Sequence, residues 1–267
     1  MPSEPVALAE LADTLWRAEC DRTPVAPITD GIPTFSASDA YAVQRININR
    51  RLDQGSVLRG RKMGLTSRAS QAALGVAEPT FGALLSDMFV DDDAELVTSD
   101  LIQPRVEAEL AFVLSRDLSG PGVTTITATR SVDCVVPVIE VGDSRIVDWR
   151  MRVMDTIADN ASSARVVLGP GFAPLTPALD LSHLGVLFHC NGFPIDSGAG
   201  AAVLGNPVRA LAWLANKLAE YGEFLSAGEI VLTGALHRMV PVRPGDEFCA
   251  EFARLGAVGV RFAGSTS

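Results

Sequence analysis

One segment limits the possible folds of this chain more than any other, the run Arg105 to Leu114 (RVEAELAFVL). Every second residue from Val106 onward is apolar, which is the pattern of a β-strand with one face against a hydrophobic core. The opposite face carries Glu107 and Glu109, whose positions are only about 7 Å apart along a strand. Spacing alone leaves two interpretations open: these acids are the solvated face of an edge strand, or they are a pair of metal ligands.

A third acid, Glu140, ends the apolar run 135–139 (VVPVI), where a solvent-facing carboxylate would be out of place. Three converging carboxylates repel each other unless a positive charge lies between them. Ligation by oxygen alone suits Mg²⁺ or Mn²⁺ better than zinc. The histidines offer no alternative ligand set, because no metal-ligand spacing links them: His183, His189 and His237.

The rest of the chain predicts an α+β protein. Helical periodicity dominates the first 55 residues, and short apolar runs bounded by Gly, Pro and Asp follow after Gly60. We therefore expect a mainly helical N-terminal region over residues 1–60 and a β-rich catalytic domain with the metal site over 61–267. The predicted helices cover 5–18, a stretch from Ser36 or Ser38 to Gly55, and a stretch that begins at Pro207 after an Asn206 cap. The predicted strands cover 106–114, 134–141, 166–169, 184–190, 229–233, 247–253 and 258–262, with a hairpin turn at Asn191-Gly192 and a turn at 244–246.

Composition excludes several classes of function. With 48% hydrophobic and 20% charged residues the chain can bury a sizeable core, and no apolar run approaches the roughly 20 residues that cross a bilayer. The acidic N-terminus lacks the basic region of a signal peptide, so we expect a cytoplasmic protein with no membrane partner. A net charge of −10 argues against a nucleic-acid partner. Four widely spaced cysteines predict small buried side chains rather than disulfides: Cys20, Cys134, Cys190 and Cys249.

Several longer strings resemble one family, in order, from about residue 40 to residue 262. They are 62–67 (KMGLTS), 71–75 (QAALG), 81–82 (FG), 103–109 (QPRVEAE), 143–149 (DSRIVDW), 155–162 (DTIADNAS), 197–201 (SGAGA), 204–207 (LGNP) and 233–235 (TGA). The chain resembles the 2-keto-4-pentenoate (2-hydroxypenta-2,4-dienoate) hydratases and the related 4-oxalocrotonate decarboxylases, within the fumarylacetoacetase-type superfamily. This resemblance covers nearly the whole chain and favours the metal site over the solvated edge strand.

The resemblance implies a fumarylacetoacetase-type mixed β-roll or barrel core, a ring-like homo-oligomer and a Mg²⁺- or Mn²⁺-dependent site in the meta-cleavage catabolism of aromatic or steroid compounds. It also implies a possible association with a pathway aldolase or a sister decarboxylase. By position, the family's metal-binding glutamates map onto Glu107, Glu109 and Glu140. Its active-site lysine and serine map onto Lys62 and Ser162, and we expect desolvation to lower the pKa of that lysine.

One position departs from the family pattern. Hydratases of this type carry an acid after the proline that precedes Phe81-Gly82, and this chain has Thr80 there. A threonine can orient water but cannot readily accept its proton, and Glu78 could substitute only after a local shift of the chain. Three further residues are candidates for substrate binding, each with a plain structural alternative (an ion pair for the first, an exposed loop for the other two): Arg145, His237 and Arg238.

The preferred hypothesis is a Mg²⁺- or Mn²⁺-dependent hydratase that adds water to a 2-hydroxyalka-2,4-dienoate and gives a 4-hydroxy-2-oxo acid. The main alternative is a 4-oxalocrotonate-type decarboxylase of a 2-oxo-enedioate, which Thr80 and the cationic pair His237-Arg238 favour. Hydrolysis of an acylpyruvate-like substrate is disfavoured, because that chemistry uses a histidine before the metal strand and none precedes His183. A non-catalytic partner subunit is disfavoured by the intact glutamates and lysine.

Overall fold

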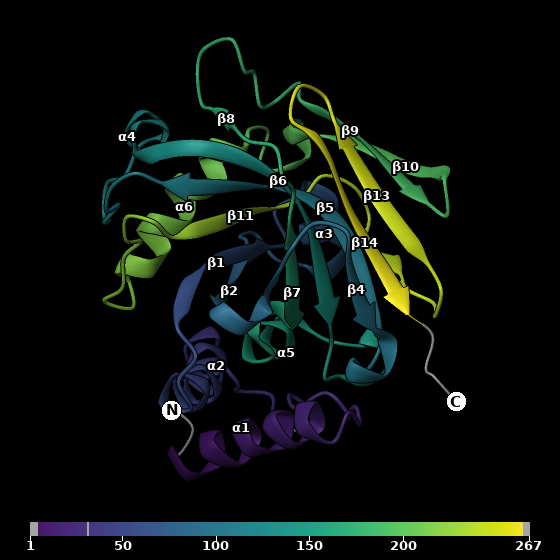
Figure 1. Ribbon diagram of the computed structural model, residues 1–267. Helices are drawn as coiled ribbons and strands as arrows, with labels where there is room; N and C mark the ends of the chain where they lie inside the picture. The colour runs from purple at the N-terminus through teal and green to yellow at the C-terminus, as the bar shows by residue number, and fades with distance from the viewer. Residues whose placement is uncertain (1–4, 31, 264–267) are drawn as a thin grey trace.

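The computed structural model describes residues 5–30 and 32–263 and shows two β-sheets with helices packed against them (Figure 1). The helices are α1 (Pro5–Cys20), α2 (Ala37–Asp53), α3 (Arg68–Leu74), α4 (Thr125–Ser131), α5 (Val153–Ala158) and α6 (Pro207–Ala219), with 3₁₀ turns that include η3 (Val147–Trp149) and η4 (Asn160–Ser162). The strands are β1 (Leu58–Gly64), β2 (Thr80–Leu85), β3 (Phe89–Val90), β4 (Ala94–Val97), β5 (Pro104–Leu114), β6 (Val132–Asp143), β7 (Ser163–Leu168), β8 (Ala173–Pro174), β9 (Gly185–Cys190), β10 (Phe193–Ala199), β11 (Ile230–Ala235), β12 (Val240–Pro241), β13 (Glu247–Phe252) and β14 (Gly256–Ala263).

The larger sheet is mixed and strongly curved. Its strand order is β2-β1-β11-β5-β6-β7-β3, with β12 beside β5 and β8 beside β6. The pairs β1–β11 and β3–β7 are parallel, and the other pairs in this sheet are antiparallel. The two longest strands, β5 and β6, lie at its centre, so side chains on both of their faces are shielded from water.

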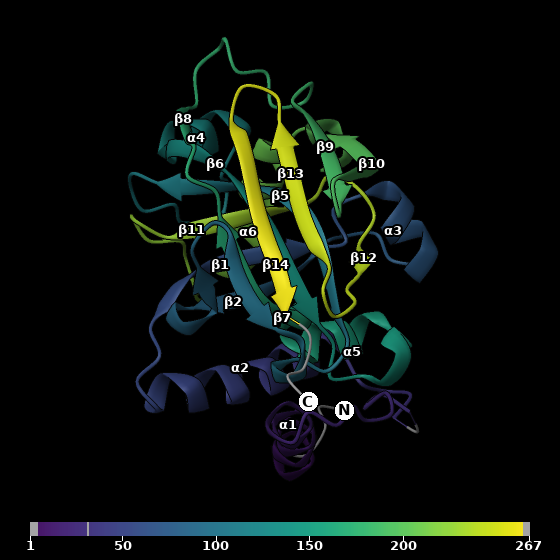
Figure 2. The same cartoon turned by 45° about the vertical axis from the view of Figure 1, so that its right-hand side comes forward.

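The smaller sheet, in the order β10-β9-β13-β14-β4, packs one face against the larger sheet. That face carries three fully buried aromatic side chains, Phe188, Phe248 and Phe262. The rings of Phe188 and Phe248 are stacked with centroids 5.7 Å apart. Figure 2 shows β13 and β14 in front of the larger sheet, so their other face is turned outward.

Helix ends follow the capping residues in the sequence. Ser36 is the N-cap of α2 and forms a reciprocal capping box with Asp39. Asn206 caps α6 by accepting a hydrogen bond from the N–H of Val208. At the base of the molecule, α1 and α2 reach the main hydrophobic core through Leu15 and Val43 (Figure 1).

The predicted long elements are confirmed. All seven predicted strands are present as β5, β6, β7, β9, β11, β13 and β14, and the three predicted helices are α1, α2 and α6. Asn191 and Gly192 join β9 to β10 with φ of 53° and 80°, the conformation of a two-residue hairpin turn. Helices α3, α4 and α5 were not predicted, because a helix of six or seven residues carries too short a periodic signal.

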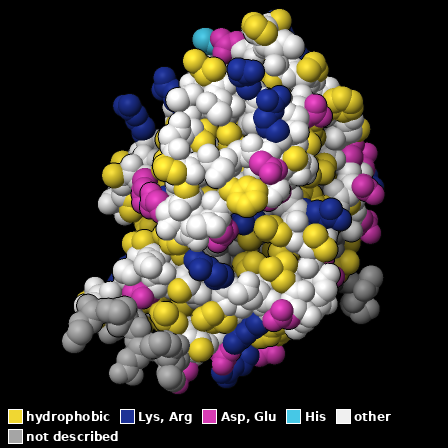
Figure 3. All heavy atoms as spheres, turned by 90° about the vertical axis from the view of Figure 1, so that its left-hand side faces the viewer, with side chains coloured by type: hydrophobic (Ala, Val, Ile, Leu, Met, Phe, Trp, Pro, Cys, Tyr) yellow, Lys and Arg dark blue, Asp and Glu magenta, His cyan; other side chains and the backbone are white. Residues whose placement is uncertain are grey.

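The four cysteines are free, as predicted, but they are less buried than predicted: Cys20 is exposed and the other three are half-buried. In the described part of the chain no helix is long and apolar enough to cross a bilayer. On the face shown in Figure 3, basic and acidic side chains alternate with hydrophobic ones, and basic side chains do not gather into a stripe.

Candidate functional site

The three glutamates of the predicted metal site meet on the two central strands. Strands β5 and β6 are antiparallel, and their register places Glu107 directly opposite Glu140. Glu109 lies two residues further along β5 on the same face. The edge-strand interpretation is wrong, because β5 lies between β11 and β6 and both of its faces are buried.

The carboxylates are close together and almost free of water. Glu109 and Glu140 are fully buried and Glu107 is 8% exposed. One oxygen from each of the three lies within 4.8 Å of the others. Burial, followed by repulsion from Glu140, raises the pKa of Glu107 to about 8, and the same two causes raise the pKa of Glu109. Without a cation, this cluster therefore binds protons at neutral pH.

Lys62 lies on β1, and β11 separates β1 from β5 in the sheet. Its Nζ lies 2.8 Å from Oε1 of Glu140, and the side chain is 3% exposed. Burial by itself lowers the pKa of Lys62, but the three neighbouring carboxylates raise it by more, so the net pKa is above the ordinary value. The expectation of a lowered lysine pKa is therefore wrong for the metal-free chain.

Two carboxylate oxygens in the cluster lack a partner. Oε2 of Glu109 accepts a hydrogen bond of 2.7 Å from the N–H of Gly234, which leaves Oε1 without one. Oε2 of Glu140 also has no hydrogen-bond donor within the described residues. Buried carboxylate oxygens without donors are costly, and the set consists of oxygen alone, so the residues fit a hard divalent cation such as Mg²⁺ or Mn²⁺.

Gly234 is required at this position for two reasons. Its φ is +106°, and a Cβ would stand 2.0 Å from Oγ1 of Thr66. The glycine therefore lets the backbone turn its N–H toward Glu109 while Thr66 packs against it.

A cavity of about 750 Å³ opens from the cluster. Lys62 and Glu107 line its inner end, and the remaining walls come from Arg105 and four other parts of the chain. These are residues 63–74, residues 149–162, residues 196–202 and residues 235–239. The cavity is large enough for a small organic acid.

Ser162 lines this cavity, as its predicted role requires, and a strained turn holds it there. Asn160, Ala161 and Ser162 all have left-handed φ, between 50° and 57°, which non-glycine residues adopt only under constraint. Asn160 supplies the constraint, because its side-chain amide donates to the carbonyl of Ala83 (2.9 Å) and accepts from the N–H of Ala83 (2.7 Å). The Ser162 hydroxyl then donates to Oδ2 of Asp159 at 3.1 Å.

Arg145 does not line the cavity. Its guanidinium pairs with Asp159 and donates at 2.7 Å to the carbonyl of Asp143, with both side chains of the pair buried. The structural ion pair is thus the interpretation that the geometry favours over direct substrate binding. Arg145 acts on the cavity through Asp159, because that carboxylate also accepts the hydrogen bond from Ser162.

Neither Thr80, a predicted substrate-binding residue, nor Glu78 is among the residues that line the cavity. Thr80 is 2% exposed and lies opposite Gly64 on the β1–β2 ladder, with a hydroxyl that has no hydrogen-bond partner among the described residues. Glu78 points to the surface, where Lys217 donates to it at 3.1 Å. The expectation that Glu78 could replace the missing acid is therefore not supported, since its carboxylate is engaged away from the cluster.

His237 and Arg238 both line the cavity, but in different ways. His237 accepts a hydrogen bond from the N–H of Ala108 at Nε2, and its Nδ1 lies 2.7 Å from the carbonyl of Arg238. Burial lowers the pKa of His237, so the ring is neutral and both nitrogens are occupied by backbone groups. Arg238 extends into solvent with 94% of its side chain exposed and lies 3.8 Å from Asp196. Of this pair, Arg238 is the residue with a cationic group at the cavity, and Asp196 lies beside that group.

Among the cavity residues that were not predicted, Arg105 is the one with a cationic side chain. Its guanidinium lies 4.6 Å above the ring of Trp149, which is fixed by a hydrogen bond of 3.0 Å to the carbonyl of Gln103. No carboxylate of the described residues pairs with Arg105, and burial lowers its pKa. The alternation of the strand could have predicted this position, because Arg105 shares a face with Glu107 and Glu109.

Known proteins resemble this chain over almost its full length. A 2-keto-4-pentenoate hydratase of Paraburkholderia xenovorans (strain LB400) is 46% identical over 254 residues, covering 95% of this chain and 94% of the relative. A 2-oxo-hept-4-ene-1,7-dioate hydratase of Escherichia coli is 40% identical over 259 residues, covering 94% and 96%. The solved structure of 4-oxalocrotonate decarboxylase from Pseudomonas putida G7, complexed with magnesium and adipate, superposes with a TM-score of 0.93 at 39% identity, covering 98% and 99%.

The sequence model described as fumarylacetoacetate (FAA) hydrolase C-terminal matches residues 59–263, which contain the glutamate cluster, Lys62 and the whole cavity wall. With that match and these relatives, the chain belongs to the FAA hydrolase family, with the α+β fold of that family.

Proposed function

We propose that this protein is a divalent-metal-dependent hydro-lyase that adds water to a 2-hydroxyalka-2,4-dienoate and gives a 4-hydroxy-2-oxo acid. The observation that carries the proposal is the convergence of Glu107, Glu109 and Glu140 beside a buried lysine at the inner end of a cavity. Relatives named as hydratases, 40% and 46% identical along nearly the whole chain, support the same reaction.

The three glutamates are assigned to hold Mg²⁺ or Mn²⁺. Together with Lys62 they carry a formal charge of −2 when all are ionised, which one divalent cation neutralises. When bound, such a cation supplies a Lewis acid that polarises the C2 oxygen of a 2-oxo acid. Two solved structures of 4-oxalocrotonate decarboxylase from Pseudomonas putida G7, 38% and 39% identical to this chain and complexed with calcium and with magnesium, support a divalent cation.

Lys62 is assigned to hold and transfer protons. The reaction moves a proton from the C2 hydroxyl of the dienol to the far end of the conjugated chain, and then places water at C4 and a proton at C3. Lys62 is buried at the inner end of the cavity, and its ammonium form is favoured by Glu140 at 2.8 Å. A positioned proton donor of this kind contributes about 10²- to 10⁴-fold to a rate.

Arg105 and Ser162 are assigned to orient the substrate. The Arg105 guanidinium lies over an aromatic ring and has no carboxylate partner among the described residues. Such an arginine is suited to bind a substrate carboxylate through two hydrogen bonds. Ser162 is fixed by its donation to Asp159, so the remaining lone pairs of its oxygen face a defined direction in the cavity. Arg105→Leu is expected to raise KM at least about 10-fold, with a smaller change in kcat. The reason is that losing even one of these charge-assisted hydrogen bonds costs about 1.5 to 3 kcal/mol.

The alternative activity, decarboxylation of a 2-oxo-enedioate, is favoured by two specific features. The position of the expected acid is occupied by Thr80, and Glu78 is engaged with Lys217, so neither supplies a base for water. Arg105 and Arg238 place two cationic groups on one cavity, one for each carboxylate of a dioate. Breaking the bond to CO₂ leaves an electron pair conjugated with the 2-oxo group and needs no base for water.

The test offers 2-hydroxypenta-2,4-dienoate and 2-oxo-3-hexenedioate separately to the Mg²⁺-loaded enzyme, and measures the 4-hydroxy-2-oxo acid and CO₂ in each reaction. If the proposed function is correct, kcat/KM for water addition to the dienoate is well above kcat/KM for CO₂ release from the enedioate. Faster CO₂ release from the enedioate establishes the alternative instead. No turnover of either substrate, with Mg²⁺ or with Mn²⁺, refutes both.

We also infer a homo-oligomer in the cytoplasm and an association with a pathway aldolase or a sister decarboxylase. Apolar side chains on the edge strand β10 support an assembly of copies, since Phe193 and Ile195 are 73% and 45% exposed. Light scattering on the purified protein tests the first part, and a monomeric mass would contradict it. Co-elution with the separately purified partner enzyme tests the second.

A further inference from the structure

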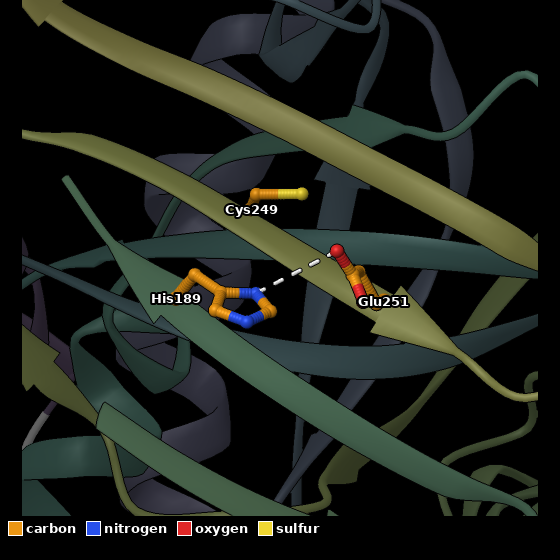
Figure 4. A group of neighbouring side chains, drawn as sticks. All are labelled: His189, Cys249 and Glu251. Carbon is orange, nitrogen blue, oxygen red and sulfur yellow. Dashed lines mark ion pairs between the residues drawn. The ribbon is translucent and has the colours of Figure 1, made fainter. Parts of the chain in front are cut away.

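A second group of potential metal ligands lies on the outer face of the smaller sheet, away from the glutamate cluster. His189 on β9 is directly opposite Cys249 on β13 in the antiparallel ladder. Glu251 lies two residues after Cys249 on the same strand and therefore on the same face. Figure 4 shows the imidazole, the thiol and the carboxylate around a common space.

The three side chains are near each other, and one weak ion pair but no hydrogen bond joins them. Their ligand atoms all lie within 4.8 Å of one another, and Nδ1 of His189 is 4.0 Å from Oε1 of Glu251, too far for a hydrogen bond. Among the described residues, no hydrogen bond engages the side chain of His189, Cys249 or Glu251. Two of the three are held on a rigid sheet with limited exposure, since His189 and Cys249 are half-buried, while Glu251 is free to turn.

The space beside them is a hollow of about 420 Å³ with a strongly negative lining. Four of its lining residues are acidic, and none of the described lining residues is lysine or arginine: Asp92, Asp93, Glu247 and Glu251. Gly259 pairs with Cys249 across β13 and β14, and a Cβ there would stand 2.6 Å from Oδ1 of Asp93. The absence of a side chain at Gly259 thus lets the Asp93 carboxylate lie against β14 in the same hollow.

Burial and the four acids raise the pKa of Cys249, so the metal-free thiol keeps its proton. A bound dication would reverse this effect. Its positive charge would neutralise the surrounding carboxylates and favour the thiolate form of Cys249.

We propose that His189, Cys249 and Glu251 form a second metal site, selective for a borderline divalent transition metal of the Zn²⁺ class. Sulfur and nitrogen ligands select this class, whereas the oxygen-only set of Glu107, Glu109 and Glu140 selects Mg²⁺ or Mn²⁺. Zn–N, Zn–O and Zn–S bonds of about 2.0 to 2.3 Å place tetrahedral ligands roughly 3.3 to 3.8 Å apart. The separation of 4.0 Å between Nδ1 of His189 and Oε1 of Glu251 reaches these values when the exposed Glu251 side chain swings inward. As the metal–sulfur bond forms, the Cys249 proton passes to solvent, and water or Asp93 takes the fourth position.

The test uses Co²⁺ as a probe on the full chain, kept loaded with excess Mg²⁺ and free of thiol reductants and chelators. Cobalt bound to a thiolate has an intense near-ultraviolet charge-transfer absorption, and cobalt bound to oxygen ligands alone does not. The wild-type protein is expected to show this absorption with saturation at one equivalent of Co²⁺, and Zn²⁺ is expected to abolish it by displacement. The Glu107→Gln variant is expected to give the same absorption, which separates this site from the glutamate cluster.

Three variants decide the ligands. Cys249→Ser is expected to lose the charge-transfer absorption while keeping the circular dichroism spectrum of the wild type. His189→Gln and Glu251→Gln are expected to keep some absorption but to weaken Co²⁺ binding at least about 10-fold, since even indirect partners of a metal ligand cost about 10- to 100-fold. Cys190→Ser is the matched control, because Cys190 is next to His189 on β9 and packs toward the core.

The proposal is overturned if the wild-type protein shows no thiolate absorption. It is also overturned if the absorption persists in folded Cys249→Ser, or if Cys190→Ser abolishes it. Unchanged Co²⁺ affinity in both His189→Gln and Glu251→Gln would likewise exclude the three-ligand site.

Discussion

Replacing Glu107 by glutamine separates the two effects that a buried carboxylate has at a metal site. In the metal-free protein, Glu107 is a buried acid beside Glu140 and costs stability when it ionises. In the metal-bound protein, the same charge is a ligand. We therefore expect Glu107→Gln to stabilise the metal-free protein at high pH and, in the same variant, to remove most of the stabilisation by Mg²⁺.

The size of the first effect follows from the pKa. Glu107 titrates at about 8 in the folded chain and at its ordinary value of 4.5 when exposed. Between these values the folded state holds a proton that the unfolded state releases, so the free energy of unfolding falls as the pH rises through this window. At about 1.36 kcal/mol per pH unit, the loss due to Glu107 between pH 5 and pH 8 is about 3 to 4 kcal/mol. This is a large part of a typical total stability of about 5 to 15 kcal/mol.

The assay is urea unfolding followed by circular dichroism at pH 5, 6.5 and 8, with EDTA and with saturating Mg²⁺. In EDTA, the variant is expected to be close to the wild type at pH 5 and to exceed it by about 3 to 4 kcal/mol at pH 8. With Mg²⁺ at about 100 times its dissociation constant, the wild type gains about 2.7 kcal/mol and the variant gains much less. Glu95→Gln is the control, because Glu95 is exposed on β4, and it should behave as the wild type in every condition.

Two results would refute this reasoning. If Glu107→Gln is less stable than the wild type in EDTA at pH 8, the carboxylate is not a destabilising buried charge. If the variant gains as much stability from Mg²⁺ as the wild type, Glu107 is not a ligand of the bound cation.

Lys62→Met is expected to lower kcat by about 10²-fold or more. Mg²⁺ binding should still be measurable by calorimetry, because the three glutamates remain. An unchanged kcat would exclude the proton-transfer role. The same variant should be destabilised in EDTA by about 3 to 5 kcal/mol, since removing one partner of a buried ion pair leaves Glu140 uncompensated. Asn160→Ala removes both hydrogen bonds to Ala83 and should cost about 2 to 4 kcal/mol in urea unfolding, with a fall in kcat as the turn that holds Ser162 relaxes. Wild-type kcat in a destabilised Asn160→Ala would show that the turn does not position the serine.

Some features of the site could be predicted from local sequence. The alternation along residues 106–114 determines that Glu107 and Glu109 share one strand face, and it places Arg105 on that face as well. Caps and turns are equally local, which is why Ser36, Asn206 and the pair Asn191-Gly192 mark their elements correctly. The order of the motifs along the chain pointed to the family, which the comparisons then confirmed.

Other features depend on which distant segments meet. Arg145 was a candidate for substrate binding, and only the folded chain shows that the Asp159 carboxylate and three backbone carbonyls take up its guanidinium. Glu78 was considered as a replacement for the missing acid, and its pairing with Lys217 on α6 turns it away from the cavity. Neither contact has a signature in the local sequence, because the partners are many residues apart.

By itself, the sequence determined seven of the strands, the three longest helices, the shared strand face of Glu107 and Glu109 and the family of the chain. Only the tertiary structure decided that β5 is a central strand, that its register sets Glu107 opposite Glu140, and that β1 brings Lys62 to 2.8 Å from Glu140. The physical reason is that side-chain periodicity is a property of neighbours along the chain, whereas burial and strand register depend on the whole sheet. The raised pKa values of Glu107 and Glu109 follow from that burial. The local sequence does not show that these acids bind protons at neutral pH in the metal-free fold.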